Sequence, residues 1–241
     1  MIMAKLHMKR ISAPRTWPIL RKKNKFVTRP DAGTHRLGNA MALGTWLTEV
    51  IGATSNNREI ARPLKQGTVQ VNGKTIIRPS YAVGLFDTIT IVPESKNFII
   101  LLNDRNTLRA VETSAYDGTK ISRVKGKRMI RTGKKQYTTF EGYSILDDSD
   151  YSVGDTIVLN TKEKKIVKAL PMKEGAHVYV TRGRSVGKTA QLKSTEGTKE
   201  VDLLLEGQEI TTLKDAIVIV DGYKQVQDAI QKMHEKNEAE Q

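Results

Sequence analysis

The feature that most constrains this chain is a long stretch without acidic residues at its start. Nine lysines and arginines precede Asp31, the first acidic residue. Pro14, Pro18 and Pro30 interrupt any regular helix or strand in this stretch. A segment of this kind has too few apolar side chains to form a core alone, and its like charges repel one another. We therefore expect a basic arm over residues 1–38 that lies on a polyanion.

The aromatic residues of this arm point to RNA as the polyanion. Cationic side chains neutralise phosphates, and aromatic rings stack on unpaired bases. Trp17 and Phe26 lie among the cations, so that their rings are available to stack on bases. A solubilising tail is the alternative, and the interleaved aromatic rings favour the arm. The expected RNA contacts of the arm are Lys5, Lys9, Arg10, Arg15, Trp17, Arg21, Lys22, Lys23, Lys25 and Arg29.

The overall composition supports a nucleic-acid partner. Forty lysines and arginines against 26 acidic residues give a formal charge of +14. No apolar run approaches the roughly 18 residues of a membrane-spanning helix, and no apolar signal segment precedes the first cations. The chain has no cysteine, and its four histidines are scattered without the spacing of metal ligands. We expect a cytoplasmic protein with no metal, no cofactor, no membrane contact and no small-molecule substrate.

Residues 39–93 read as two helices followed by two strands. Apolar residues recur at helical spacing from 39 to 52, so that Trp46 is expected in the core. A second, short helix ends at Gly67 and contains Pro63, which is expected to kink it. A strand at 68–71 leads into an Asn-Gly hairpin turn, and another strand is expected at 88–92. The cations that we expect around the second helix and hairpin to bind RNA are Arg58, Arg62, Lys65, Lys74 and Arg78.

Residues 94–171 are rich in strand patterns. Apolar runs predict buried strands at 98–102 and 156–159. A second basic cluster lies between them without an acidic residue, and it includes Lys120. One solvated strand face is the alternative, but so many uncompensated cations favour contact with phosphates. The expected contacts are Arg123, Lys125, Lys127, Arg128, Arg131, Lys134 and Lys135.

Residues 172–222 predict a small strand-built domain, and residues 223–241 a terminal helix or tail. Strands are expected at 175–180, 190–192 and 216–220. The loop at 182–188 is similar to a phosphate-binding loop, but it has three residues where that motif needs four, and it leads toward a strand. A nucleotide-hydrolysing enzyme is therefore not expected. The loop cations that we expect to bind RNA are Arg182, Arg184 and Lys188.

Several of these segments resemble known motifs. Arg58-Glu59, Gly67 and residues 69–74 resemble the S-four RNA-binding domain, and residues 174–192 look like a KOW motif. Their order after a basic arm is similar to that of the archaeal and eukaryotic small-subunit ribosomal protein S-four, e-type family. Further matches to its signature are His7-Met8-Lys9-Arg10, Ala13-Pro14, Trp17, Arg29-Pro30, Gly33, His35 and Thr211-Thr212-Leu213.

The resemblance implies an α+β, multi-domain fold. Its parts are the arm (1–38), a small αα-β-β S-four-like domain (39–93), a strand-rich central domain (94–171) and a C-terminal SH3-like β-barrel with the KOW motif (172–222). The implied function is structural and non-catalytic: binding small-subunit ribosomal RNA beside neighbouring small-subunit ribosomal proteins. The alternatives are an RNA-modifying enzyme that uses an S-four-like tether, and a KOW-type transcription-elongation factor. The first lacks room for a catalytic domain, and the second does not account for the arm.

Overall fold

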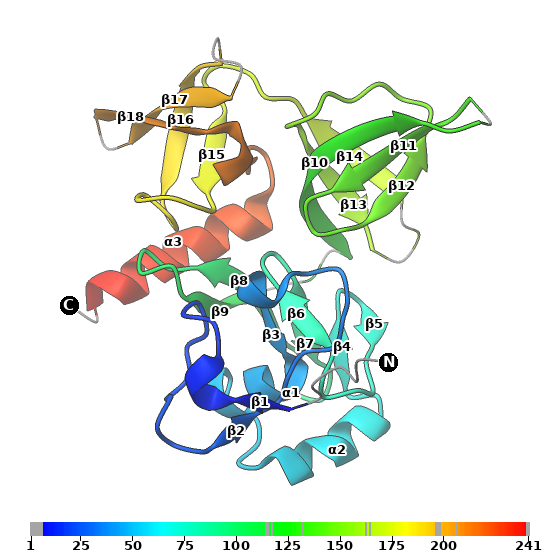
Figure 1. Cartoon of the computed structure of the whole chain (residues 1–241), viewed down its shortest axis with the longest axis vertical. Helices are drawn as coiled ribbons and strands as arrows, with labels where there is room; N and C mark the ends of the chain where they lie inside the picture. The colour runs from blue at the N-terminus through cyan, green and yellow to red at the C-terminus, as the bar shows by residue number, and fades with distance from the viewer. Residues whose placement is uncertain are drawn as a thin grey trace. The chain divides into compact units, whose positions relative to one another are not determined.

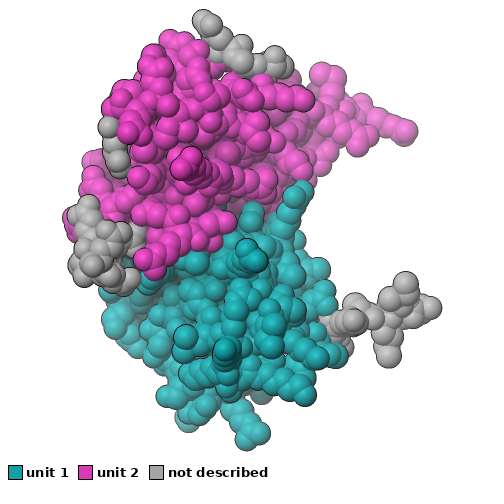
Figure 2. Space-filling view, turned by 60° about the vertical axis from the view of Figure 1, so that its left-hand side comes forward, with its two compact units in different colours: residues 1–101, 107–114 teal, residues 102–106, 115–241 magenta. Residues whose placement is uncertain are grey.

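The chain is divided into two compact units. Figure 1 presents a computed structural model, which describes residues 7–113, 116, 118–131, 133–161, 163, 165–195, 199–205 and 207–239. Unit 1 comprises residues 1–101 and 107–114, and unit 2 comprises residues 102–106 and 115–241 (Figure 2). Both units consist mainly of antiparallel sheet with few helices. The fold is therefore α+β and multi-domain, as the sequence predicts.

The N-terminal segment, described from residue 7, is packed into unit 1, whereas we expected a basic arm that cannot form a core alone and lies on RNA. Trp17 and Arg10 are 3% and 1% exposed. Long-range contacts hold the segment: Leu108 N donates to Thr16 O at 2.8 Å, and the guanidinium of Arg10 bonds to Glu49. The prediction that Arg10 and Trp17 contact RNA is corrected, because both side chains lie in the interior. The elements of this segment are β1 (Met8–Lys9), η1 (Arg10–Ser12), β2 (Phe26–Val27) and η2 (Leu37–Asn39).

The helix expected from residue 39 begins later. Residues Ala40–Ala42 form strand β3, which pairs with β6 (Ala82–Gly84), and this pairing removes them from the helix. The helical part consists of α1 (Leu43–Thr45) followed by η3 (Trp46–Val50), a π-helical segment. Trp46 is fully buried, and its Nε1 donates to Val83 O at 3.2 Å. The expected core role of Trp46 is confirmed.

The second helix and the Asn-Gly hairpin form as predicted. Helix α2 (Asn57–Lys65) contains Pro63 and is followed by Gly67, whose positive φ of 74° ends the helical path. Strand β4 (Val69–Val71) turns into β5 (Lys74–Thr75). Asn72 and Gly73 both have positive φ, at 51° and 72°, as a tight hairpin turn requires.

The sheet of unit 1 continues beyond residue 93, where we expected the domain to end. Strand β7 (Thr88–Ile91) pairs with β4 on one side and with β8 (Lys96–Leu102) on the other. Together with β9 (Leu108–Thr113) this gives a five-stranded sheet of order β5-β4-β7-β8-β9. The apolar run at 98–102 therefore completes this sheet rather than beginning the next one.

Unit 2 contains two further five-stranded sheets. In the first, of order β12-β11-β10-β13-β14, the long strand β10 pairs with both β11 and β13. Its core consists of Val124, Tyr137, Ile145, Ile157 and Leu159. The strands are β10 (Thr119–Met129), β11 (Lys135–Thr139), β12 (Ser144–Asp147), β13 (Thr156–Asn160) and β14 (Lys165–Leu170).

The second sheet of unit 2 has the order β18-β17-β16-β15-β19 and is followed by helix α3 (Lys224–Ala239). Val226, Ile230 and Met233 are buried, so the predicted helical stripe is a packed face. No helix in the described part of the chain is long and apolar enough to cross a membrane. The other elements are β15 (His177–Val180), β16 (Thr189–Ser194), β17 (Glu200–Leu205), β18 (Gln208–Leu213), η4 (Lys214–Ala216) and β19 (Ile217–Ile219).

Candidate nucleic-acid interface

Most cations of the N-terminal segment remain on its surface although the backbone is packed. Arg10 is an exception, because it is buried. Arg21 is another: it is half-buried, and its guanidinium donates to the carbonyls of Ile11, Ala13 and Pro14 at 2.9–3.1 Å. Arg21 therefore stabilises the fold of the N-terminal segment. Lys5 lies outside the described residues. The exposed cations are Lys9, Arg15, Lys22, Lys23, Lys25 and Arg29.

Helix α2 presents a basic face opposite its buried face. Ile60 and Leu64 are fully buried, whereas Arg58, Arg62 and Lys65 are exposed. These three cations are four and three residues apart, which places them along one side of the helix. Lys74 and Arg78, in and after the hairpin, are also exposed. All five cations predicted in this region are available to a polyanion.

A buried polar network fixes the hairpin end of unit 1. The carboxylate of Asp87 accepts hydrogen bonds from Asn72 Nδ2 at 2.6 Å and from Gly84 N at 2.8 Å. His35 Nε2 lies 2.8 Å from the same carboxylate, and both side chains are nearly inaccessible to solvent. The network joins the N-terminal segment to the Asn-Gly turn that precedes Lys74. Sequence reasoning missed Asp87, because nothing in the local pattern distinguishes it from a surface turn residue.

The basic cluster of unit 2 contacts an acidic residue, Asp150, that follows it in the sequence. The carboxylate of Asp150 accepts hydrogen bonds from Lys127 and, at 3.2 Å, from Lys135. The hydrogen bond with Asp150 raises the pKa of Lys127, and the Lys127 ammonium holds the pKa of the Asp150 carboxyl below its ordinary value. The prediction that this cluster has no compensating acid is therefore wrong, because Asp150 lies beside it in the folded chain. The exposed cations without a partner among the described residues are Lys125, Arg128, Arg131 and Lys134.

Arg123 has a structural position. Its side chain is 3% exposed, and it donates to Lys214 O at 2.7 Å and to Asp215 Oδ1 at 3.1 Å. Burial lowers the pKa of Arg123, and the Asp215 carboxylate opposes that effect. The predicted RNA contact of Arg123 is corrected, because its donors are used to join β10 to the turn before β19.

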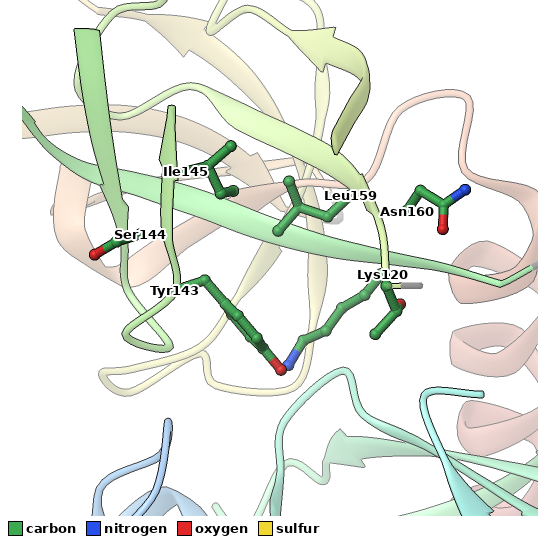
Figure 3. A pocket seen from close by; sticks show the side chains of 7 residues that line it. Lys120, Tyr143, Ser144, Ile145, Leu159 and Asn160 are labelled. Atoms are coloured by element: carbon green, nitrogen blue, oxygen red, sulfur yellow. The ribbon is translucent and has the colours of Figure 1, made fainter. Parts of the chain in front are cut away.

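Lys120 is also interior rather than part of a phosphate-binding surface. It is 2% exposed, and its Nζ lies 5.1 Å from the centre of the Tyr143 ring. Figure 3 shows the two side chains pointing toward one another at a pocket lined in part by Ile145 and Leu159. The volume of about 30 Å³ leaves room for only about one or two waters. This pocket cannot hold a substrate.

The loop at 182–188 carries exposed Arg182 and Arg184 beside an open groove of about 550 Å³. Arg182 lies over the Phe140 ring, 4.9 Å from its centre, and Lys188 is half-buried. The loop leads directly into β16, so the arrangement of a phosphate-binding loop before a helix is absent, as predicted. Among the described residues, no three His, Asp or Glu side chains gather as metal ligands.

Comparisons with known proteins point to one family. Family models described as RS4NT (NUC023) domain and ribosomal family S4e match residues 4–38 and 94–166. The small ribosomal subunit protein eS4 of Archaeoglobus fulgidus is 33% identical over 225 residues, covering 90% of this chain and 94% of that protein. The protein of the same name from Methanosphaera stadtmanae is 33% identical over 207 residues, covering 84% and 86%.

A solved structure shows the same fold. The crystal structure of the 30S ribosomal protein S4e from Thermoplasma acidophilum aligns with a TM-score of 0.59 at 24% identity. The alignment covers 75% of this chain and 93% of that chain. The similarity therefore extends over nearly the whole of the solved protein.

Proposed function

Because the chain belongs to the S4e family of ribosomal proteins, we propose that it is a structural constituent of the small ribosomal subunit. Its relatives carry the name small ribosomal subunit protein eS4 and match it over nearly their whole length. Such a protein acts in the cytoplasm, on the ribosome, by binding and organising small-subunit ribosomal RNA. It is not an enzyme.

The observation that carries this proposal is a set of exposed cations on several separate elements. They have no acidic partner among the described residues, so their charge is available to phosphates. Because they lie on a helix, two hairpins and loops, they suit an irregular RNA surface better than one regular groove. The set comprises Lys9, Arg15, Lys22, Lys23, Lys25, Arg58, Arg62, Lys65, Lys74, Arg78, Lys125, Arg128, Arg131, Lys134 and Arg184.

The domain roles are part of the proposal. We assign RNA binding to an S-four-like domain around α2 and the Asn72–Gly73 turn, supported by the basic face of α2. A KOW-type, SH3-like barrel is proposed for residues 172–222, supported by the antiparallel order β18-β17-β16-β15-β19. Arg29, Arg182 and Lys188 are proposed as further contacts, together with Lys127 and Lys135 once Asp150 releases them. Neighbouring ribosomal proteins are the proposed protein partners.

The alternatives receive no support from the site. The pocket at Lys120 is too small for a substrate, and the relatives that match along most of the chain are named as ribosomal proteins, not as RNA-modifying enzymes. A transcription-elongation factor would not account for eS4 relatives that match along 90% of the chain.

Binding to small-subunit ribosomal RNA over a range of salt concentrations tests the proposal. Replacing Arg58, Arg62 and Lys65 together by Gln removes three cations that would bind phosphates. The slope of log affinity against log salt should fall by about 0.7–0.9 for each cation removed. Lys96→Gln is the matched control, because Lys96 is exposed but bonded to Glu94 at 2.9 Å. An unchanged slope in the triple variant would contradict the assignment of α2.

A further inference from the structure

The N-terminal segment and helix α2 line one open groove within unit 1. Its volume is about 790 Å³. Its lining includes Lys23 and Asn24 from the N-terminal segment, Ser55 before α2, and Arg58 in the first turn of α2. Sequence reasoning placed Lys23 and Arg58 in separate RNA-binding regions. The fold brings them to the same groove.

The two acidic residues that line this groove are already hydrogen-bonded. Both carboxylate oxygens of Glu49 accept from the guanidinium of Arg10, one of them at 3.1 Å. Both oxygens of Glu59 accept from local donors, Ser55 N at 3.1 Å and Asn56 Nδ2 at 3.5 Å. By contrast, Lys23 and Arg58 have no partner among the described residues. The groove therefore presents two free cations, while Arg10 neutralises Glu49, and Glu59 keeps its charge but has both oxygens hydrogen-bonded.

From this arrangement we infer that the groove binds one unpaired segment of ribosomal RNA, with phosphates on Lys23 and Arg58. The inference rests on the proposed function and adds a site to it. The volume of about 790 Å³ is in the range of about 300–1,000 Å³ that holds one small molecule, which fits a few nucleotides and not a duplex. Asn24, which follows Lys23 in the sequence and also lines the groove, supplies an amide that can bond to the edge of an exposed base.

Arg10 is a positioning residue for this site. It is 1% exposed and therefore makes no contact with RNA itself. Its guanidinium also donates to Leu20 O at 2.8 Å, so it fixes the N-terminal segment while it neutralises Glu49. Without Arg10, the Glu49 carboxylate would face the RNA phosphates with its full charge. The effect of removing Arg10 should therefore depend on Glu49.

A double-mutant cycle of Arg10 and Glu49 tests this role of Arg10. Arg10→Met should lower affinity for small-subunit ribosomal RNA about tenfold, and Glu49→Gln in the same chain should restore most of that affinity. Thermal unfolding of each variant separates charge from misfolding. The control pair is Lys193→Met with Glu209→Gln, which removes an exposed ion pair from the sheet of β15 to β19. If Arg10→Met has no effect, or if Glu49→Gln restores nothing, the role assigned to Arg10 is wrong.

The site itself is tested by tethered cleavage, since the chain has no cysteine of its own. Asn24→Cys and Ser55→Cys, each carrying an iron chelate that generates hydroxyl radicals, are bound to small-subunit ribosomal RNA. Lys193→Cys serves as the control position. Overlapping cuts from positions 24 and 55 in one unpaired segment are expected. Cuts in unrelated segments, or cuts from position 193 alone, would overturn the groove but not the ribosomal role. Failure of every variant and of the unmodified chain to bind the RNA would overturn the proposed function.

Discussion

The hydroxyl of Tyr179 is bonded to both backbone groups of Leu102: it donates to the carbonyl at 2.6 Å and accepts from the amide at 3.0 Å. Tyr179 is fully buried, so no water replaces it. Tyr179→Phe should lower the free energy of unfolding by about 1–3 kcal/mol, because it leaves two buried backbone groups without a partner. Urea unfolding measures this. Tyr151→Phe is the control, since its bond to Asp147 is only partly buried and its removal should cost less.

The same tyrosine makes stability fall in alkali. Burial raises the pKa of Tyr179 above its ordinary value. Above about pH 10 the unfolded chain therefore releases a proton that the folded chain retains, and stability decreases as the pH rises. The decrease should be shallower in Tyr179→Phe by up to about 1.4 kcal/mol per pH unit, the limit reached when the unfolded tyrosine is fully ionised. Equal slopes for the two proteins between pH 10 and 11 would contradict this assignment.

The Asp87 network should dominate the stability of unit 1. Asp87→Ala leaves His35, Asn72 Nδ2 and the amide of Gly84 without their acceptor in a buried site. The expected decrease in the free energy of unfolding is about 3–5 kcal/mol, because several buried polar groups lose an acceptor at once and each costs about 1–3 kcal/mol. Denaturant unfolding followed by tryptophan fluorescence reports on this region, since Trp46 is in its core. Asp31→Ala, which removes an exposed bond to Ser80, should cost less than about 1 kcal/mol.

Substitutions of Gly183 and Gly187 in the 182–188 loop distinguish the cost of backbone strain from the cost of close packing. Gly183 and Gly187 both have positive φ, at 102° and 81°. A Cβ at Gly187 would lie 2.7 Å from the backbone carbon of Asn103, whereas one at Gly183 would meet nothing within 4 Å. Gly183→Ala should therefore cost about 1 kcal/mol, and Gly187→Ala clearly more. Similar melting temperatures for the two variants would contradict the close approach of the loop to residues 102–104.

Asp150 should weaken RNA binding in the wild-type protein. Its carboxyl is ionised at neutral pH, as that of an ordinary aspartate is, the Lys127 ammonium lowers its pKa further, and it occupies Lys127 and Lys135. Asp150→Asn should raise affinity for small-subunit ribosomal RNA and steepen the salt slope by up to about 0.9 for each lysine released. Asp148→Asn, an exposed change of equal charge nearby, is the control. Equal increases in affinity from both variants would indicate a general charge effect instead.

Local patterns predicted the elements that depend on local chemistry. The Asn72–Gly73 turn needs two residues that accept positive φ, and the end of α2 needs Gly67, so both were visible in the sequence. The buried stripe of α3 followed from helical spacing. The cations of α2 are exposed, as their predicted contact with RNA requires, because the apolar Ile60 and Leu64 take the opposite, buried face.

Contacts between distant segments could not be predicted in this way. Arg10 is buried because it bonds to Glu49, which lies 39 residues later in the sequence. No local pattern indicates that pairing. Lys127 lies 23 residues from Asp150, so an acid-free stretch in the sequence is not acid-free in space. The predicted start of the first helix is likewise wrong, because residues 40–42 form a strand that pairs with β6.

Sedimentation of a native lysate tests whether the protein is a constituent of the small ribosomal subunit. The protein is followed by immunoblot through sucrose gradients at low and at high salt. We expect it to travel with the small ribosomal subunit and to stay there through moderate salt washing, because many phosphate contacts act together. Recovery of the protein at the top of the gradient at low salt, free of the small subunit, would contradict the structural ribosomal role.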